Sequence, residues 1–222
     1  MGKNKLARFD AVKSFENFFE PSLQEDFELK GNWRKDYFRN DNPIVLELGC
    51  GKGEYTVGLA KHYKNKNFIG VDIKGSRMFV GADEARREGI PNAAFLRTKI
   101  DFIDKYFGKD EVDEIWLTFS DPQPKKPRKR LTSPLFIDRY RKILKPGGIV
   151  NIKTDSDLLF EFTEEEIKRN NYECLELTWD LYGSIPENID PTIREILHIR
   201  THYENLFTAR GAQIKYAKFR IN

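Results

Sequence analysis

Three glycines on alternate positions follow a short apolar run and form the most informative stretch of the sequence. Residues 44–48 read Ile-Val-Leu-Glu-Leu, and Gly49, Gly51 and Gly53 come directly after them. Glycines at this spacing let the backbone turn tightly and approach a ligand closely. A helix that starts after them brings its free N–H groups to the same place. The spacing therefore predicts a ligand-binding turn between a strand and a helix.

Two carboxylates flank this turn. Glu47 stands just before it, and Asp72 ends the next apolar run, where an acid can bind ribose hydroxyls. A dinucleotide-binding turn would have its third glycine at position 54, which is Glu54 here. Because Glu47 and Glu54 would repel a pyrophosphate, the pattern favours an adenosine ligand with a cationic or amine-bearing tail. An ordinary strand-to-helix turn is the alternative.

A third acid, Asp121, follows another apolar run and is the candidate catalytic residue. Ligands of open α/β sheets bind at the carboxyl ends of the strands, so we expect Asp121 at the same edge as Glu47 and Asp72. Pro122 and Pro124 restrict the backbone around it. The alternative is a structural turn capped by an aspartate.

A basic run, Lys-Lys-Pro-Arg-Lys-Arg at residues 125–130, comes directly after this loop. Such a run is commonly only a solvated face. Next to a candidate site, however, it favours the phosphates of a nucleic acid. The net charge of the chain, +3, is too small to indicate nucleic acid by itself.

Apolar runs and helical patterns alternate from residue 44 onward, which indicates a mostly parallel sheet with helices on both faces. Five parallel strands are expected near residues 44–48, 67–72, 93–97, 112–119 and 148–154. Helices are expected near residues 54–63, 75–88, 133–144 and 156–169. Segments 172–179 and 213–219 alternate apolar and polar residues, so they predict an antiparallel C-terminal hairpin and seven strands in total.

The chain of 222 residues is expected to hold one main domain, residues 41–222. Residues 1–40 show no clear strand pattern and are predicted to be a partly flexible or helical extension. Its aromatic residues either pack onto the main domain or contribute to an RNA-binding face.

Composition excludes several classes of protein. The two cysteines lack metal-binding or disulfide-framework spacing, and the few histidines do not suggest a metal site. No apolar stretch approaches the roughly 20 residues of a membrane span, and no signal peptide is evident. A cytoplasmic protein without a metal is expected, either a monomer or a homodimer.

Several motifs together resemble a known family. The run Asp-Pro-Gln-Pro-Lys-Lys-Pro-Arg-Lys-Arg-Leu, with later Lys-Pro-Gly-Gly, Lys-Thr-Asp and Thr-His-Tyr-Glu, is similar to the bacterial tRNA (guanine-N7-)-methyltransferase family over about residues 40–210. The glycine turn resembles motif I of class I S-adenosylmethionine-dependent methyltransferases. The resemblance implies a Rossmann-like class I methyltransferase fold and methyl transfer to N7 of a tRNA variable-loop guanosine, position 46 in the family's usual assignment.

The same resemblance implies two sets of site residues. The S-adenosylmethionine set is Glu47, Gly49, Gly51, Gly53, Asp72, Lys99 and Asp121. The tRNA guanosine set is Lys125, Arg130, Asp155, Thr201, His202, Tyr203 and Glu204.

The chain departs from the family pattern at two sites. After Asp121, Gln123 stands where the family usually has Trp, and residues 127–129 stand where it usually has a His-containing basic loop that is two residues longer. Lys99 stands where the family usually has Asp or Asn. Lys99 can donate hydrogen bonds but cannot accept them. The alternatives to the implied function are a methyltransferase for another acceptor and a non-catalytic RNA-binding protein with a vestigial cofactor site.

Overall fold

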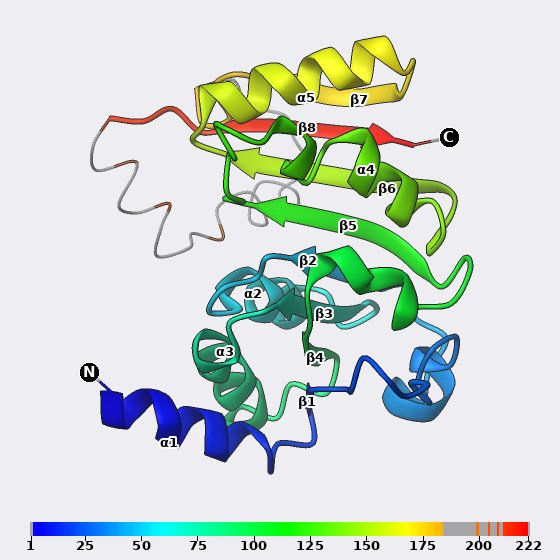
Figure 1. The fold of residues 1–222 in the computed structure, drawn as a ribbon, viewed down its shortest axis with the longest axis vertical. Helices are drawn as coiled ribbons and strands as arrows, with labels where there is room; N and C mark the ends of the chain where they lie inside the picture. Colours follow the sequence, from blue (N-terminus) through cyan, green and yellow to red (C-terminus); the bar gives the residue numbers. More distant parts are fainter. Residues whose placement is uncertain (1, 184–198, 200–203, 205–207, 209–210, 222) are drawn as a thin grey trace.

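The computed structural model describes residues 2–183, 199, 204, 208 and 211–221, and within them one sheet organises the fold. Its eight strands lie in the order β1-β4-β3-β2-β5-β6-β8-β7, with β7 at one end of the molecule and β1 at the other (Figure 1). The strands are β1 (Phe18–Phe19), β2 (Ile44–Leu48), β3 (Asn67–Asp72), β4 (Ala93–Arg97), β5 (Val112–Thr118), β6 (Leu144–Thr154), β7 (Glu173–Thr178) and β8 (Lys215–Arg220).

Strands β1 to β6 pair in parallel, and β8 runs antiparallel to both of its neighbours, β6 and β7. The predicted parallel core with an antiparallel C-terminal hairpin is therefore confirmed. The sheet also has a strand that the sequence did not predict. Strand β1 pairs with β4 through Phe18 and Phe19, and two residues are too short to show a strand pattern.

Helices cover both faces of the sheet, as expected. They are α1 (Gly2–Val12), α2 (Glu54–His62), α3 (Gly75–Arg87), α4 (Pro134–Tyr140) and α5 (Asp157–Arg169), with a π-helix η1 (Trp33–Phe38) and 3₁₀ turns η2 (Ile100–Lys105) and η3 (Pro127–Lys129). Alternate residues of β2 enter different cores: Ile44 and Leu46 pack with α4 and α5, and Val45 packs with α2 and α3. Burial on both faces explains the continuous apolar pattern of this strand.

Helix α4 is shorter than the sequence predicted. It ends at Tyr140, four residues before the expected end. The carbonyl of Ile143 accepts a hydrogen bond from Val112 N at 2.9 Å, so this residue already pairs with β5. The register then shifts, because Leu144 faces Val112 and Ile149 faces Glu114.

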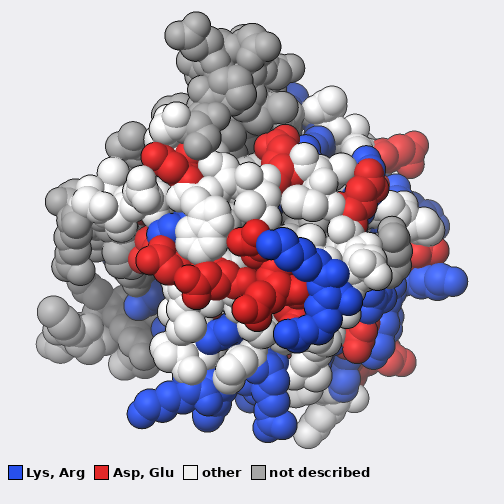
Figure 2. Space-filling view, turned by 90° about the horizontal axis from the view of Figure 1, so that it is seen from above, with Lys and Arg blue, Asp and Glu red and all other residues white. Residues whose placement is uncertain are grey.

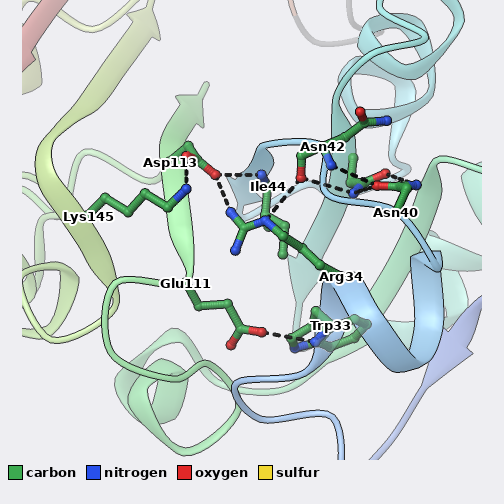
Figure 3. A network of polar contacts seen from close by, with 9 residues as sticks. Trp33, Arg34, Asn40, Asn42, Ile44, Glu111, Asp113 and Lys145 are labelled. Atoms are coloured by element: carbon green, nitrogen blue, oxygen red, sulfur yellow. Dashed lines mark hydrogen bonds and ion pairs between the residues drawn. The ribbon is translucent and has the colours of Figure 1, made fainter.

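A polar network joins the N-terminal segment to the edge of the sheet where the parallel strands begin (Figure 3). The carboxylate of Asp113 accepts a hydrogen bond from Ile44 N at 2.7 Å and pairs with Arg34 at 2.5 Å and Lys145 at 2.7 Å. Three segments distant in sequence are thereby tied together. This edge is opposite to the carboxyl ends of β2 and β5.

Glu111 completes the attachment. Its carboxylate accepts backbone N–H groups of Gly31, Trp33 and Gly108 at 2.8, 2.9 and 2.7 Å. The Trp33 side chain is 0% exposed and its ring stacks on Phe107 at 5.5 Å. The N-terminal segment thus contributes a central core residue to the domain.

Candidate active site

A cavity of about 620 Å³ lies at the carboxyl ends of β2, β3, β5 and β6. Five acidic residues line it: Glu47, Asp72, Asp121, Asp155 and Glu54. The first three are the acids that the sequence expected at one edge of the sheet, and the structure brings them together. Open α/β sheets bind their ligands at this edge.

The glycine turn forms one wall of the cavity. Gly49, Gly51 and Gly53 have φ values of +85°, +57° and +76°, a region that favours glycine. A Cβ at Gly49 or Gly51 would meet nothing within 4 Å, whereas a Cβ at Gly53 would lie 2.4 Å from Cε1 of Phe95. The first two glycines therefore leave space for a ligand, and the third allows close packing inside the protein.

Asp72 is fixed by two backbone donors. Its Oδ2 accepts from Gly51 N at 2.9 Å, and its Oδ1 accepts from Lys74 N at 2.8 Å. Each carboxylate oxygen keeps a further acceptor site. The side chain is half-buried, so those sites are available to a ligand in the cavity.

Glu47 is more enclosed, since only 3% of the residue is exposed. Its carboxylate accepts from Thr56 N at 2.8 Å, from the Thr56 hydroxyl, and from Thr118 Oγ1 at 2.5 Å. Burial raises the pKa of Glu47 to about 7, although hydrogen bonds from Thr118 and Thr56 oppose the rise. Neither threonine was predicted from the sequence, where their only signal is their position beside the glycine turn and at the end of β5.

The loop that carries Asp121 has a strained backbone. Phe119 and Gln123 adopt φ values of 49° and 45°, which are rare for residues other than glycine. Asp121 itself is exposed, and its Oδ1 accepts from Gln123 N at 2.9 Å. The Ser120 hydroxyl oxygen is buried with no hydrogen-bond partner among the described residues. Strain of this kind persists where the surroundings hold a loop in one shape, and it is concentrated at functional sites.

Arg130 supports this loop from inside. The residue is only 5% exposed, its Nε donates to the carbonyl of Pro122 at 2.9 Å, and its guanidinium lies 4.6 Å from the ring centre of Phe162. The resemblance placed Arg130 among the tRNA-binding residues. In the structure its contacts are with the protein.

Four exposed basic residues precede Arg130 and are called the basic lip: Lys125, Lys126, Arg128 and Lys129. Lys129 lines the cavity, and its Nζ pairs with Asp101 at 2.8 Å. The short turn η3 presents this lip next to the Asp121 loop. The basic run therefore borders the opening of the cavity.

Lys99 lines a second cavity, of about 460 Å³, that adjoins the first and shares Asp72, Ile73 and Ile100 with it. The Lys99 side chain is exposed, and its carbonyl accepts from Phe102 N at 2.9 Å. Lys99 thus lines the same cavity as Asp72 and as Gln123 of the Asp121 loop.

The remaining predicted site residues that the structure describes, Asp155 and Glu204, do not share one environment. Asp155 is half-buried in the cavity wall, and burial raises its pKa. Glu204 is fully buried, with its carboxylate paired to Lys153 at 3.0 Å and bonded by the Tyr182 hydroxyl. The expected tRNA-binding residues Thr201, His202 and Tyr203 lie outside the described residues.

Comparison with known proteins agrees with this geometry. A family model described as "Putative methyltransferase" matches residues 41–217. The tRNA (guanine-N(7)-)-methyltransferase of Bacteroides thetaiotaomicron is 52% identical, over 100% of this chain and 87% of that protein. The chain belongs to the tRNA (guanine-N(7)-)-methyltransferase family. Another relative in this family, from Christiangramia forsetii, is 45% identical over 99% of this chain and 98% of its own.

Solved structures support the fold of this family member. The 16S rRNA methyltransferase KamB superposes with a TM-score of 0.62 over 87% of this chain and 94% of its own, at 13% identity. A geranyl diphosphate methyltransferase solved in complex with SAM has a TM-score of 0.53 over 81% of this chain and 78% of its own, at 13% identity. At such identities the likeness shows a shared Rossmann-like methyltransferase fold.

No helix among the residues that the structure describes is long and apolar enough to cross a membrane. Within the same residues, no group of three His, Cys, Asp or Glu side chains is arranged to hold a metal ion.

Proposed function

We propose that this protein transfers the methyl group of S-adenosylmethionine to N7 of a guanosine in the variable loop of tRNA, at position 46. One observation carries the proposal: Glu47, Asp72, Asp121 and Asp155 line a single cavity that opens beside the basic lip. The family membership supports the reaction, and the cavity supplies a place for both reactants.

The residues present fit S-adenosylmethionine, which supplies an electrophilic methyl group on a positively charged sulfur. Asp72 has free acceptor sites for ribose hydroxyls, and the open space at Gly49 and Gly51 allows the ligand to approach the backbone. Ile73 and Ile100 offer apolar surface to an adenine ring. The acids of the cavity complement the positive charge of the ligand.

The second reactant needs positioning more than acid-base chemistry. Guanine N7 is an acceptor with an in-plane lone pair and carries no proton, so the transfer requires no general base. Rate enhancement then rests on holding two ligands in line. In this proposal Asp121 and Asp155 accept hydrogen bonds from guanine N1–H and the exocyclic amine, and their negative charge favours the positive charge that develops on the purine.

The distribution of surface charge favours approach of the RNA along the basic lip. The end of the molecule formed by α5 and β7 exposes several acids, and Figure 2 shows Asp and Glu side chains gathered in a band across the middle of that end. Lys and Arg side chains border this band in the same view, whereas the basic lip carries exposed positive charge that attracts phosphates. Because helical RNA hides N7 in a deep, narrow groove, a loop guanosine that turns out of its stack is the suitable acceptor.

Two tRNA transcripts that differ only at the variable-loop guanosine test this proposal. With labelled S-adenosylmethionine, the unmodified transcript is expected to accept label, and the transcript with adenosine at that position is expected to accept none. Equal labelling of both would place the acceptor elsewhere. Calorimetry with S-adenosylmethionine alone is expected to show binding, whereas a vestigial cofactor site would show none.

A further inference from the structure

A buried lysine of the C-terminal hairpin lies next to the candidate active site. Lys215 begins β8, and only 5% of the residue is exposed. Its Nζ donates a hydrogen bond to the backbone carbonyl of Asp155 at 2.9 Å and forms an ion pair with Asp157. Strand β8 lies beside β6, whose carboxyl end leads into Asp155 (Figure 1). A residue late in the sequence is therefore bonded to one of the acids that line the cavity.

Asp155 lies in the short turn between β6 and α5. Next to it, Ser156 N donates to Thr154 Oγ1 at 3.1 Å, and Ser156 Oγ accepts from Leu159 N at 3.2 Å, which caps α5. Thr154 is paired with Lys215 in the antiparallel register of β6 and β8. These contacts are local to the turn or to the sheet. The Asp155 carbonyl is held differently, because its donor is a side chain from another strand.

The hydrogen bond from Lys215 restrains the backbone of Asp155 and leaves its side chain to line the cavity. A hydrogen bond from a charged donor is stronger than one between neutral groups. Burial raises the pKa of the Asp155 carboxyl, and the positive charge of Lys215 opposes that rise. Loss of the lysine therefore affects both the position of the carboxylate and its tendency to stay ionised.

Direct contact with an RNA phosphate is the alternative role for a basic residue at this place. Only 6% of the Lys215 side chain is exposed, and its ammonium is bonded to the Asp155 carbonyl and the Asp157 carboxylate. The lysines of the basic lip, in contrast, are exposed. Burial and bonding thus favour an action of Lys215 through Asp155.

We infer that Lys215 is a positioning residue for the guanosine side of the site: it holds Asp155 in place through the backbone carbonyl and does not contact the RNA. The inference rests on the proposed function, in which Asp155 accepts a hydrogen bond from the guanine. A lysine in a strand that alternates apolar and polar residues is expected to face solvent, so this role was not predictable from the sequence.

A double-mutant cycle tests the inference with Lys215→Met, Asp155→Asn and the variant that carries both. Asp155→Asn removes the carboxylate charge and keeps the backbone carbonyl to which Lys215 donates. Each single variant is expected to lose about tenfold or more in kcat/KM for tRNA. Because Lys215 acts through the Asp155 carboxylate, the double variant should match Asp155→Asn within about twofold. A lysine that only stabilises the fold would lower kcat/KM by the same factor in both backgrounds, and that result would overturn the inference.

The salt dependence of tRNA affinity separates positioning from phosphate contact. Lys215→Met is expected to keep the wild-type slope of log affinity against log salt, whereas loss of a phosphate contact would reduce the slope. A reduced slope would overturn the inference. Affinity of Lys215→Met for S-adenosylmethionine, measured by calorimetry, should stay within about twofold of wild type.

The matched control is Lys218→Met, which changes a half-buried lysine of the same strand whose side chain points to the opposite face of the sheet. Its kcat/KM is expected to equal that of the wild type. Normal kcat/KM in Lys215→Met or in Asp155→Asn would overturn the inference. If Lys215→Met does not fold by circular dichroism, the shorter and neutral Lys215→Gln replaces it in the cycle, and the same outcomes decide.

The wild-type protein separates this inference from the proposed function. Wild-type protein that binds S-adenosylmethionine and leaves tRNA unlabelled contradicts the proposed function. Wild-type activity together with independent losses in the cycle contradicts only the role of Lys215.

Discussion

The carboxylate of Asp72 accepts a hydrogen bond from the backbone N–H of Gly51 at 2.9 Å. The acid that ends β3 is thereby fixed by the glycine turn that follows β2. Two parts of the proposed S-adenosylmethionine site therefore keep a constant separation before the ligand binds, which reduces the cost of ordering them on binding.

The glycines of this turn are expected to respond differently to alanine. Gly51→Ala strains the backbone at φ +57° in open space, so it should cost about 1 kcal/mol of unfolding free energy and weaken S-adenosylmethionine binding. Gly53→Ala adds a clash with Phe95 and should cost about 3 kcal/mol. Urea unfolding of both variants measures the difference. Equal destabilisation would show that Phe95 does not limit position 53.

Asp121 is expected to matter for turnover and not for folding. The residue is exposed, and Asp121→Asn keeps an acceptor for Gln123 N while removing the charge. We expect both Asp121→Asn and Asp121→Ala to lower kcat by about 100-fold, because charge aimed at the developing positive purine is lost. The matched control is Asp138→Asn, an exposed acid on α4. Near-normal turnover of Asp121→Asn would mean that the charge is unimportant.

Glu47 should make folding stability depend on pH. Its pKa is raised from 4.5 to about 7 in the folded protein, so the folded state binds the proton more tightly than the unfolded state. The stabilisation is fully present below pH 4.5 and is lost as pH rises through 7, by about 3 kcal/mol. Urea unfolding across this range, compared with Glu47→Gln, measures the loss.

Glu47→Gln is the reference in that experiment because an amide does not titrate. Its unfolding free energy is expected to change less between pH 4.5 and 8 than that of the wild type. Parallel curves for the two proteins would show that Glu47 keeps an ordinary pKa.

The basic lip is expected to give salt-dependent affinity for tRNA. Lys125→Gln and Lys126→Gln should each weaken binding, and each should reduce the slope of log affinity against log salt by about 0.7 to 0.9 if the side chain contacts a phosphate. Lys109→Gln serves as control, since this exposed lysine precedes β5 at the opposite edge of the sheet. Filter binding at several salt concentrations gives the slopes. An unchanged slope in both lip variants would remove the lip from the RNA interface.

Hydrophobic pattern was enough to predict most of the sheet. Strands β2 to β5 begin and end within a residue or so of their expected positions, because short apolar runs that are bounded by turn residues and alternate with helical patterns favour buried strands. Strand β1 could not be found in this way, since its two residues pair only in the context of β4. The end of α4 was misplaced because Ile143 satisfies a helical pattern and yet pairs with β5.

The sequence could predict the site residues that stand at the ends of strands, but not those whose surroundings depend on packing. Asp72 and Asp121 follow apolar runs, so the common edge of the sheet places them together. The burial of Arg130 beneath its own loop has no signature in a basic run. The burial of Lys153 does have a signature in the sequence, since a lysine within the apolar run of β6 indicates a buried charge that requires a partner.

The most direct test of the account is nucleoside analysis of unmodified tRNA after incubation with the protein and labelled S-adenosylmethionine. We predict that the label is recovered as N7-methylguanosine from the variable loop. Label on another base or another atom of guanine, or no label with a protein that binds S-adenosylmethionine, would contradict the account.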